Sequence, residues 1–124
     1  MTVSKFFFDT SAWLCYFGES SNKVKEIVEE DGQIYTSALS LLELKRKLKK
    51  KKVSDVEQKK LLEFLSTRTV WINVNLEIAA KSSEFENLHT VDSIIYASCL
   101  ITESTLITLD NDFRGLKNVV IINE

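Results

Sequence analysis

The feature that most constrains the fold is the alternation of short apolar runs with longer segments of helical periodicity. We expect strands at 5–9, 33–36, 69–74, 106–109 and 119–123, and helices at 10–18, 20–32, 38–51, 55–68, 76–88 and 91–104. This alternation predicts an α/β domain with a mainly parallel sheet. The strands are apolar throughout rather than at every second position, which indicates that helices cover both faces of the sheet.

The length of 124 residues fits one domain, which we expect to span 1–124. No stretch approaches about 18 uninterrupted apolar residues, so we expect no membrane span. The N-terminus lacks the zones of a signal peptide. Cys15 and Cys99 lie in apolar helical patterns and are interpreted as buried reduced thiols, which favours the cytoplasm.

Several common sites are excluded by missing residue types. With three glycines in the chain and no glycine-rich turn after the first strand, neither a dinucleotide-binding fingerprint nor a Walker-type phosphate loop is present. The only histidine is His89, so a Cys/His zinc site is absent.

The charge distribution is uneven. The net charge of −2 argues against a generally basic nucleic-acid binder, yet residues 45–52 contain seven cations in eight positions. One interpretation is a solvated helix end, whose cations complement the helix dipole. The other is a surface that contacts phosphate groups.

Acidic residues stand at unusual places. Asp9 ends the first strand, and Asp110 and Asp112 follow the fourth. Ligands of open α/β sheets bind beyond the carboxyl ends of the strands, so we expect these two strands to be neighbours with converging acids. Glu43 lies among leucines, and Asp92 opens a nearly all-apolar helix.

Each acid also has a simpler explanation. Asp9 would cap the following helix, Glu43 would mark a solvent-facing side, and Asp92 would favour the helix dipole. Asp110 and Asp112 would form a turn. All of these explanations would have to hold together, so we interpret the acids as members of a shared site.

A shared carboxylate site predicts a bound cation. Carboxylates gathered closely raise one another's pKa and stay ionised only if a cation joins them. Oxygen ligands without histidine or cysteine suit Mg²⁺ or Mn²⁺. Such an ion commonly binds phosphate oxygens and activates a water for attack on phosphorus.

The stretches "FFFDTSAW", "SALSLLELKRKL", "TVDSIIYASC" and "LITLDNDF" together resemble the PIN-domain ribonucleases, especially the VapC-type toxins of toxin–antitoxin modules. The resemblance spans the chain from residue 5 to the last strand. It implies a three-layer fold, with a five-stranded sheet in the order 3-2-1-4-5 between helices.

The resemblance also implies roles for the acids. Asp9 and Asp92 would be the main metal ligands, Glu43 and Asp110 would complete the catalytic quartet, and Asp112 would assist. The expected activity is Mg²⁺- or Mn²⁺-dependent hydrolysis of RNA phosphodiester bonds. We expect the substrate-binding residues to be Ser11, Thr108, Lys45, Arg46 and Lys49, the hydroxyls by orienting ligands or phosphate and the cations by holding the RNA backbone.

The expected partners are an RNA substrate, a second copy of the chain and a small antitoxin protein. Trp13, Tyr16 and Phe17 are compatible with an interface, although their spacing is more typical of a core. The alternatives are an RNA-processing PIN nuclease outside a toxin–antitoxin pair and a non-catalytic phospho-receiver-like domain. The receiver needs an aspartate after its third strand, and a haloacid-dehalogenase-type phosphatase needs Asp-x-Asp after its first; the chain has neither.

Overall fold

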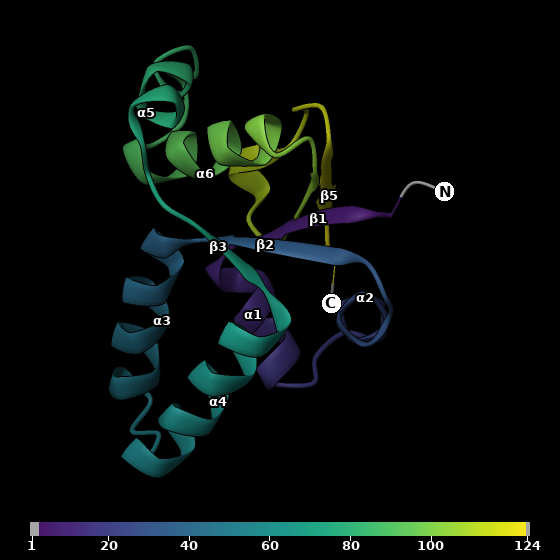
Figure 1. Ribbon diagram of the computed structural model, residues 1–124, viewed down its shortest axis with the longest axis vertical. Helices are drawn as coiled ribbons and strands as arrows, with labels where there is room; N and C mark the ends of the chain where they lie inside the picture. Colours follow the sequence, from purple (N-terminus) through teal and green to yellow (C-terminus); the bar gives the residue numbers. More distant parts are fainter. Residues whose placement is uncertain (1–2, 124) are drawn as a thin grey trace.

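A parallel sheet of five strands forms the middle layer of the computed structural model, which describes residues 3–123 (Figure 1). Its strands are β1 (Lys5–Phe8), β2 (Gln33–Ser37), β3 (Val70–Ile72), β4 (Thr105–Thr108) and β5 (Val119–Ile121). They pair in the order β3-β2-β1-β4-β5, and every pair is parallel. The predicted fold class and strand order are confirmed.

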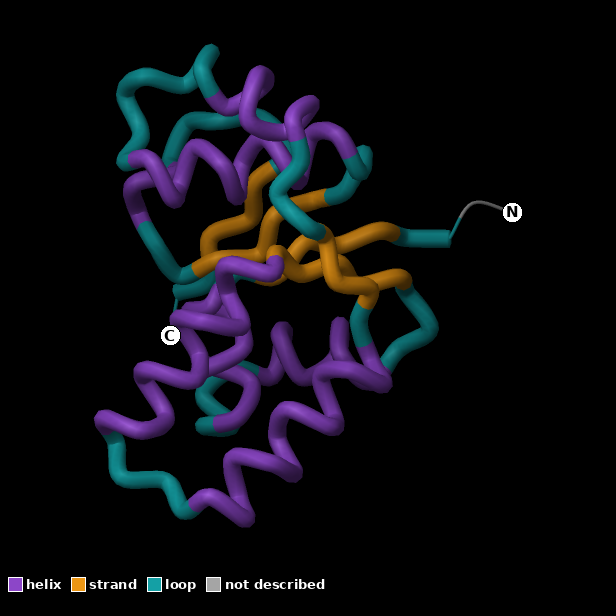
Figure 2. Tube along the Cα trace, turned by 60° about the vertical axis from the view of Figure 1, so that its left-hand side comes forward, coloured by secondary structure: helices purple, strands orange, loops and turns teal. Residues whose placement is uncertain are grey.

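Helices cover both faces of the sheet. They are α1 (Thr10–Phe17), α2 (Asn22–Glu29), α3 (Ala38–Lys50), α4 (Asp55–Arg68), α5 (Leu76–Ser82) and α6 (Thr90–Ile101), with a short 3₁₀ helix η1 (Asn111–Phe113). The α5–α6 pair lies on one face, and α1, α3 and α4 lie on the other (Figures 1 and 2). Within residues 3–123, none of these helices has the length and apolar character needed to cross a membrane.

Polar side chains set where several helices begin. Ser37, Ser54 and Asn75 accept hydrogen bonds from backbone N–H groups in the first turns of α3, α4 and α5, as their positions in the sequence predict. The cap of α1 is Asp9, in agreement with the capping explanation of this acid.

The helix predicted at 76–88 is shorter in the structure, where α5 ends at Ser82. The Ser82 and Ser83 hydroxyls donate to the carbonyls of Ala79 and Ala80, and the backbone then continues through turns. Serine side chains compete in this way with the helical backbone hydrogen bonds.

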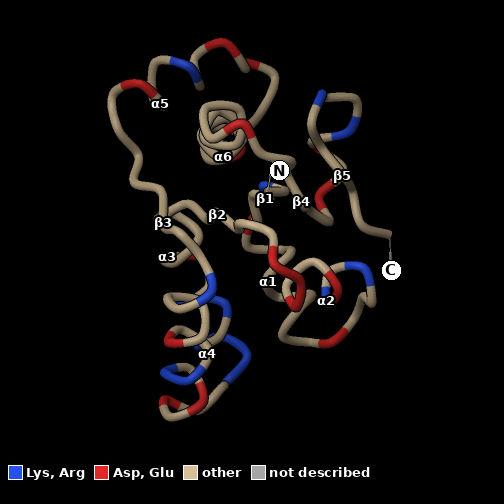
Figure 3. Tube along the Cα trace, turned by 45° about the vertical axis from the view of Figure 1, so that its right-hand side comes forward, with Lys and Arg blue, Asp and Glu red and all other residues tan. Residues whose placement is uncertain are grey.

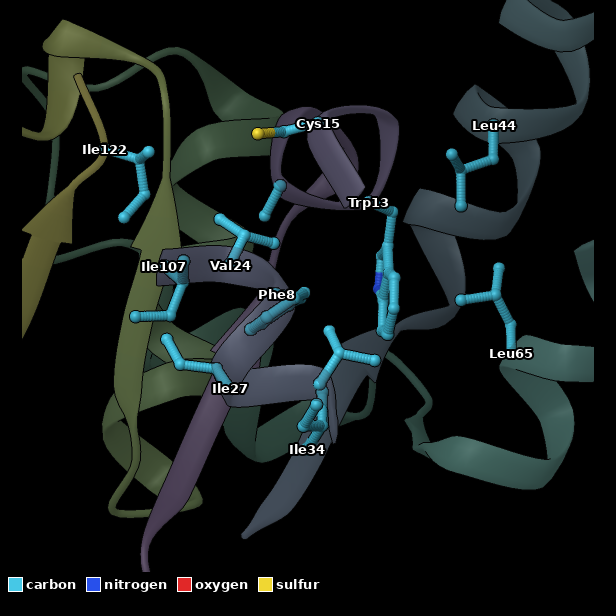
Figure 4. Packing of buried hydrophobic residues seen from close by; sticks show 12 residues of the cluster. Phe8, Trp13, Cys15, Val24, Ile27, Ile34, Leu44, Leu65, Ile107 and Ile122 are labelled. Atoms are coloured by element: carbon cyan, nitrogen blue, oxygen red, sulfur yellow. The ribbon is translucent and has the colours of Figure 1, made fainter. Parts of the chain in front are cut away.

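Alternate residues of the central strands enter two separate cores. Phe8 and Ile107 pack on the face covered by α1 to α4, where Trp13 is completely buried (Figure 4). Phe7 and Leu106 pack on the other face, with residues of α6. This is the side-chain alternation of a strand that is buried on both sides. Trp13 is therefore a core residue and not part of an interface.

Candidate metal centre

The central strands β1 and β4 bring distant parts of the chain to one edge of the sheet. They are adjacent and parallel, with Phe7 beside Leu106 and Phe8 beside Ile107, so the chain leaves both strands at the same edge. Asp9 follows β1 directly, and Asp110 follows β4 by two residues. The predicted convergence of the first and fourth strands is found in the structure.

Asp9 is buried, and both of its carboxylate oxygens accept hydrogen bonds. Its Oδ1 accepts from the Ser11 hydroxyl at 2.7 Å and from the Ala12 backbone N–H at 3.0 Å. Its Oδ2 accepts from the Thr108 hydroxyl at 2.5 Å. Burial raises the pKa of Asp9 above its ordinary value, although these hydrogen bonds oppose the rise. Asp9 thus caps α1 and also lies at the edge of the sheet where Glu43, Asp92, Asp110 and Asp112 gather, the acidic edge.

Three further carboxylates form a tight cluster. Asp92, Asp110 and Asp112 each offer an oxygen within 4.8 Å of the others. The Asp112 backbone N–H donates to Asp110 Oδ1 at 2.8 Å, which holds the turn that carries both acids. The pKa of Asp92 is raised to about 6, first by burial and then by the negative charges of Asp110, Asp112 and Asp9, while His89 lowers it.

Glu43 reaches the same edge from α3. The Thr10 hydroxyl donates to Glu43 Oε1 at 3.3 Å, so the glutamate faces the first residue of α1, next to Asp9. Glu43 is not among the three most tightly clustered acids. The structure therefore brings together Asp92, Asp110 and Asp112, with Asp9 in electrostatic contact and Glu43 linked through Thr10.

Two hydroxyls hold the acidic edge together. Thr108 Oγ1 donates to Asp9, accepts from the Asp110 backbone N–H at 3.0 Å, and lies 3.4 Å from Ser11 Oγ. Ser11 Oγ accepts from the Leu109 backbone N–H at 2.9 Å. Thr108 is completely buried and its hydroxyl contacts Asp9, so of the two predicted roles this geometry favours orienting a ligand over contacting phosphate. The half-buried Ser11 has the same contact with Asp9.

The three cations predicted to hold RNA are all exposed, but they do not share one side of α3. Lys45 and Lys49 line a groove of about 950 Å³ between α3 and α4. Glu43 points instead toward α1. The position of these two lysines therefore does not favour the predicted role beside the acids. Arg46 does not line the groove.

The chemistry of the acidic edge fits a divalent cation. All of the donors are carboxylate oxygens, which suit Mg²⁺ and Mn²⁺. Within residues 3–123, no side chain donates a hydrogen bond to the Asp92 carboxylate or forms an ion pair with it. Burial first and the neighbouring carboxylates second raise the pKa of Asp92, and a bound cation would oppose both effects.

The contribution of His89 was not predicted from the sequence. His89 directly precedes α6 and lies close enough to Asp92 to lower the pKa of that carboxyl. Its position in the sequence gave no signal of this role.

The chain belongs to the PIN domain family, whose model matches residues 6–119. The resemblance predicted from the four sequence stretches is therefore confirmed. A comparison with curated proteins gives no match.

Solved structures of toxin–antitoxin proteins share the fold. A toxin–antitoxin complex from Klebsiella pneumoniae matches with a TM-score of 0.75 and 25% identity over 95% of this chain and 98% of the other. VapBC2 from Rickettsia felis, bound to a DNA fragment from its promoter, matches with a TM-score of 0.73 and 17% identity over 96% and 98% of the two chains. VapC20 from Mycobacterium tuberculosis, a sarcin–ricin loop cleaving toxin, matches with a TM-score of 0.71 and 18% identity over 96% of this chain and 99% of the other.

Proposed function

We propose that the protein is a metal-dependent endoribonuclease and the toxin of a type II toxin–antitoxin module that acts in the cytoplasm. The observation that carries this proposal is the gathering of Asp9, Glu43, Asp92, Asp110 and Asp112 at one edge of the sheet. Membership of the PIN domain family and the likeness to a toxin that cleaves the sarcin–ricin loop both support it.

We assign three residues to the ion, Asp92, Asp110 and Asp112, with Asp9 beside them. A bound Mg²⁺ or Mn²⁺ would supply the positive charge that stabilises the phosphate in the transition state and lowers the pKa of the attacking water. Asp92 must lose its proton before it can act as a ligand. Glu43 completes the acidic edge from α3, within reach of the Thr10 hydroxyl.

Thr108, Ser11 and the Ala12 N–H keep Asp9 in one orientation by three hydrogen bonds. A ligand that is held in advance does not have to be ordered when the metal and the substrate bind. This is the positioning role that we assign to the two hydroxyls.

The proposed partners are a small antitoxin and a second copy of this chain. Their support is the likeness to a toxin–antitoxin complex from Klebsiella pneumoniae and to VapBC complexes from other bacteria. We expect a short reading frame next to this gene, and we expect its product to suppress the toxicity of the chain when the two are expressed together. Toxicity that persists with that product present would favour a PIN nuclease that processes RNA outside such a pair.

A phospho-receiver-like domain is disfavoured by topology as well as by sequence. Flavodoxin-like receivers have the strand order 2-1-3-4-5, whereas this sheet has the order β3-β2-β1-β4-β5.

The test is cleavage of a structured RNA by the purified protein, with Mg²⁺, with Mn²⁺ or with EDTA. We expect cleavage only with metal, and a loss of about a hundredfold or more in rate for Asp9→Asn and Asp92→Asn. Asp31→Asn is the matched control, because Asp31 is exposed and precedes β2, at the opposite edge of the sheet. Equal cleavage by wild type, D9N and D92N would contradict the proposal.

A further inference from the structure

Glu43 identifies the side of α3 that faces the acidic edge. Its carboxylate accepts a hydrogen bond from Thr10, the residue after Asp9. The core-facing side of the same helix carries Leu44 and Leu48, which are both buried. The remaining positions of α3 can therefore be assigned by their rotation around the helix axis from Glu43.

The lysines of the basic run divide between two sides of α3. At about 100° per residue, Lys47 and Lys50 lie roughly 40° and 20° from Glu43 around the axis. Lys45 and Lys49 lie roughly 160° and 120° from it, and both line the groove between α3 and α4. The basic run is therefore two surfaces rather than one.

Lys47 and Lys50 are exposed, and their charges are not paired. In the described part of the chain the only ion pair joins Lys81 to Glu84. Lys47 stands four residues after Glu43, a spacing that favours a helical ion pair. Glu43 instead bonds to Thr10, which leaves the Lys47 ammonium group available to a partner.

The two surfaces differ in electrostatic character. The groove that holds Lys45 and Lys49 is also lined by Asp55 and Glu63, so its positive charge is partly balanced. Figure 3 shows this mixture of positive and negative charge on α3 and α4. Along the axis, Lys47 and Lys50 lie only about 6 and 10 Å beyond Glu43.

An acidic edge repels the phosphates of a polynucleotide, so cations next to it are needed to hold the strand there. Taking the proposed nuclease activity as its basis, we infer that Lys47 and Lys50 hold the sugar–phosphate backbone of single-stranded RNA where it leaves the acidic edge along α3. Lys45 and Lys49 have no part in this contact. The backbone contact binds RNA without reading its sequence.

The test compares two double variants of the same helix, K47Q/K50Q and K45Q/K49Q. Each removes two charges, and glutamine keeps a similar helix propensity. The last turn of α3 holds both Lys47 and Lys50, but of the other pair only Lys49. Binding of a fluorescein-labelled single-stranded RNA is followed by anisotropy in EDTA, over a series of salt concentrations. We expect K47Q/K50Q to weaken binding about tenfold at low salt and to reduce the slope of log K against log salt by about 1.4, or about 0.7 for each lost phosphate contact.

K45Q/K49Q is expected to bind RNA within about twofold of wild type with an unchanged salt slope. The assignment would be overturned by equal losses of RNA affinity in the two variants, by a larger loss in K45Q/K49Q, or by no loss in either. Thermal unfolding of both variants tests the alternative role. Cations that merely complement the helix dipole would change stability, more in K47Q/K50Q than in K45Q/K49Q, and would leave RNA affinity unchanged. Cleavage by wild-type protein with Mg²⁺ separately tests the nuclease activity. A failure of the lysine assignment can therefore be distinguished from a failure of the proposed nuclease function.

Discussion

At the scale of single residues, the acids at this edge serve the fold and the candidate site together. Asp9 caps α1 with one carboxylate oxygen and meets the Thr108 hydroxyl of β4 with the other. Asp110 similarly uses one oxygen to hold the turn that carries Asp112. A local capping role and membership of a metal site are therefore compatible, since a carboxylate offers several acceptor positions.

Thr108→Val tests the positioning role of the buried hydroxyl. Valine has a similar shape but cannot donate to Asp9 or accept from the Asp110 N–H. We expect a loss of about 1–3 kcal/mol in the free energy of unfolding and a lower cleavage rate. Thr108→Ser restores the hydroxyl and should recover most of the rate. If T108V cleaves RNA as fast as T108S, the hydroxyl does not position Asp9 for catalysis.

At the scale of elements, one arginine ties three segments together. Arg68, in the last turn of α4, donates to the carbonyls of Val28, Ile27, Glu30 and Gly32, at the end of α2 and the approach to β2. Ile27 and Val28 belong to the last turn of α2, whose carbonyls a helix end leaves without partners, and a cation there also complements the dipole. Arg68 thus links α4 to the end of α2 by hydrogen bonds, on the same face of the sheet.

Arg68→Gln should lower the free energy of unfolding by about 2–3 kcal/mol, because charged donors to several half-buried carbonyls are lost. The measurement is urea denaturation followed by circular dichroism. Lys60→Gln on the same helix is the control, because Lys60 is exposed and is expected to change stability by less than about 0.5 kcal/mol. Equal urea midpoints for R68Q and K60Q would show that the arginine does not stabilise the fold.

At the scale of the whole molecule, the strand order decides where charge accumulates. Because β1 and β4 are central neighbours, acids separated by about a hundred positions in the chain meet at one edge. The basic helix α3 begins at that edge, directly after β2. Negative and positive surfaces thus lie next to each other, an arrangement that suits a cation and a polyanion together.

Metal binding should stabilise the folded protein, and the effect should depend on pH. The pKa of Asp92 is raised to about 6 from an ordinary 3.8, so its ionised form disfavours folding above pH 6 when no metal is present. That destabilising contribution is relieved as the pH falls through 6 toward 3.8. A divalent cation reverses the preference, because it binds the ionised carboxylate.

We therefore expect Mn²⁺ to raise the melting temperature at pH 7.5 and to have much less effect at pH 5.0. At a concentration of about 100 Kd, the added stability is about 2.7 kcal/mol. Asp92→Asn should melt at a higher temperature than wild type at pH 7.5 without metal, and it should respond weakly to Mn²⁺. A Mn²⁺ response that is equal at both pH values, or equal in D92N, would exclude Asp92 as a ligand.

Much of the fold follows from patterns that neighbouring residues carry. Apolar runs such as 5–8 predict buried strands, and Ser37, Ser54 and Asn75 predict where helices begin, because capping and burial depend on local sequence. Local patterns were less reliable where side chains compete with the backbone, as at Ser82 and Ser83, where α5 ends early.

The acids of the candidate site could be chosen from the sequence because each stands at an element end or in an apolar setting. Only the tertiary structure decided how they group: Asp92, Asp110 and Asp112 tightly, and Glu43 through Thr10. The tertiary structure likewise decided that the Thr108 hydroxyl is buried and that Lys45 and Lys49 line a groove between α3 and α4. Residue order determines which groups a helix or strand presents together, whereas contacts between elements determine which of those groups meet water, a metal or each other.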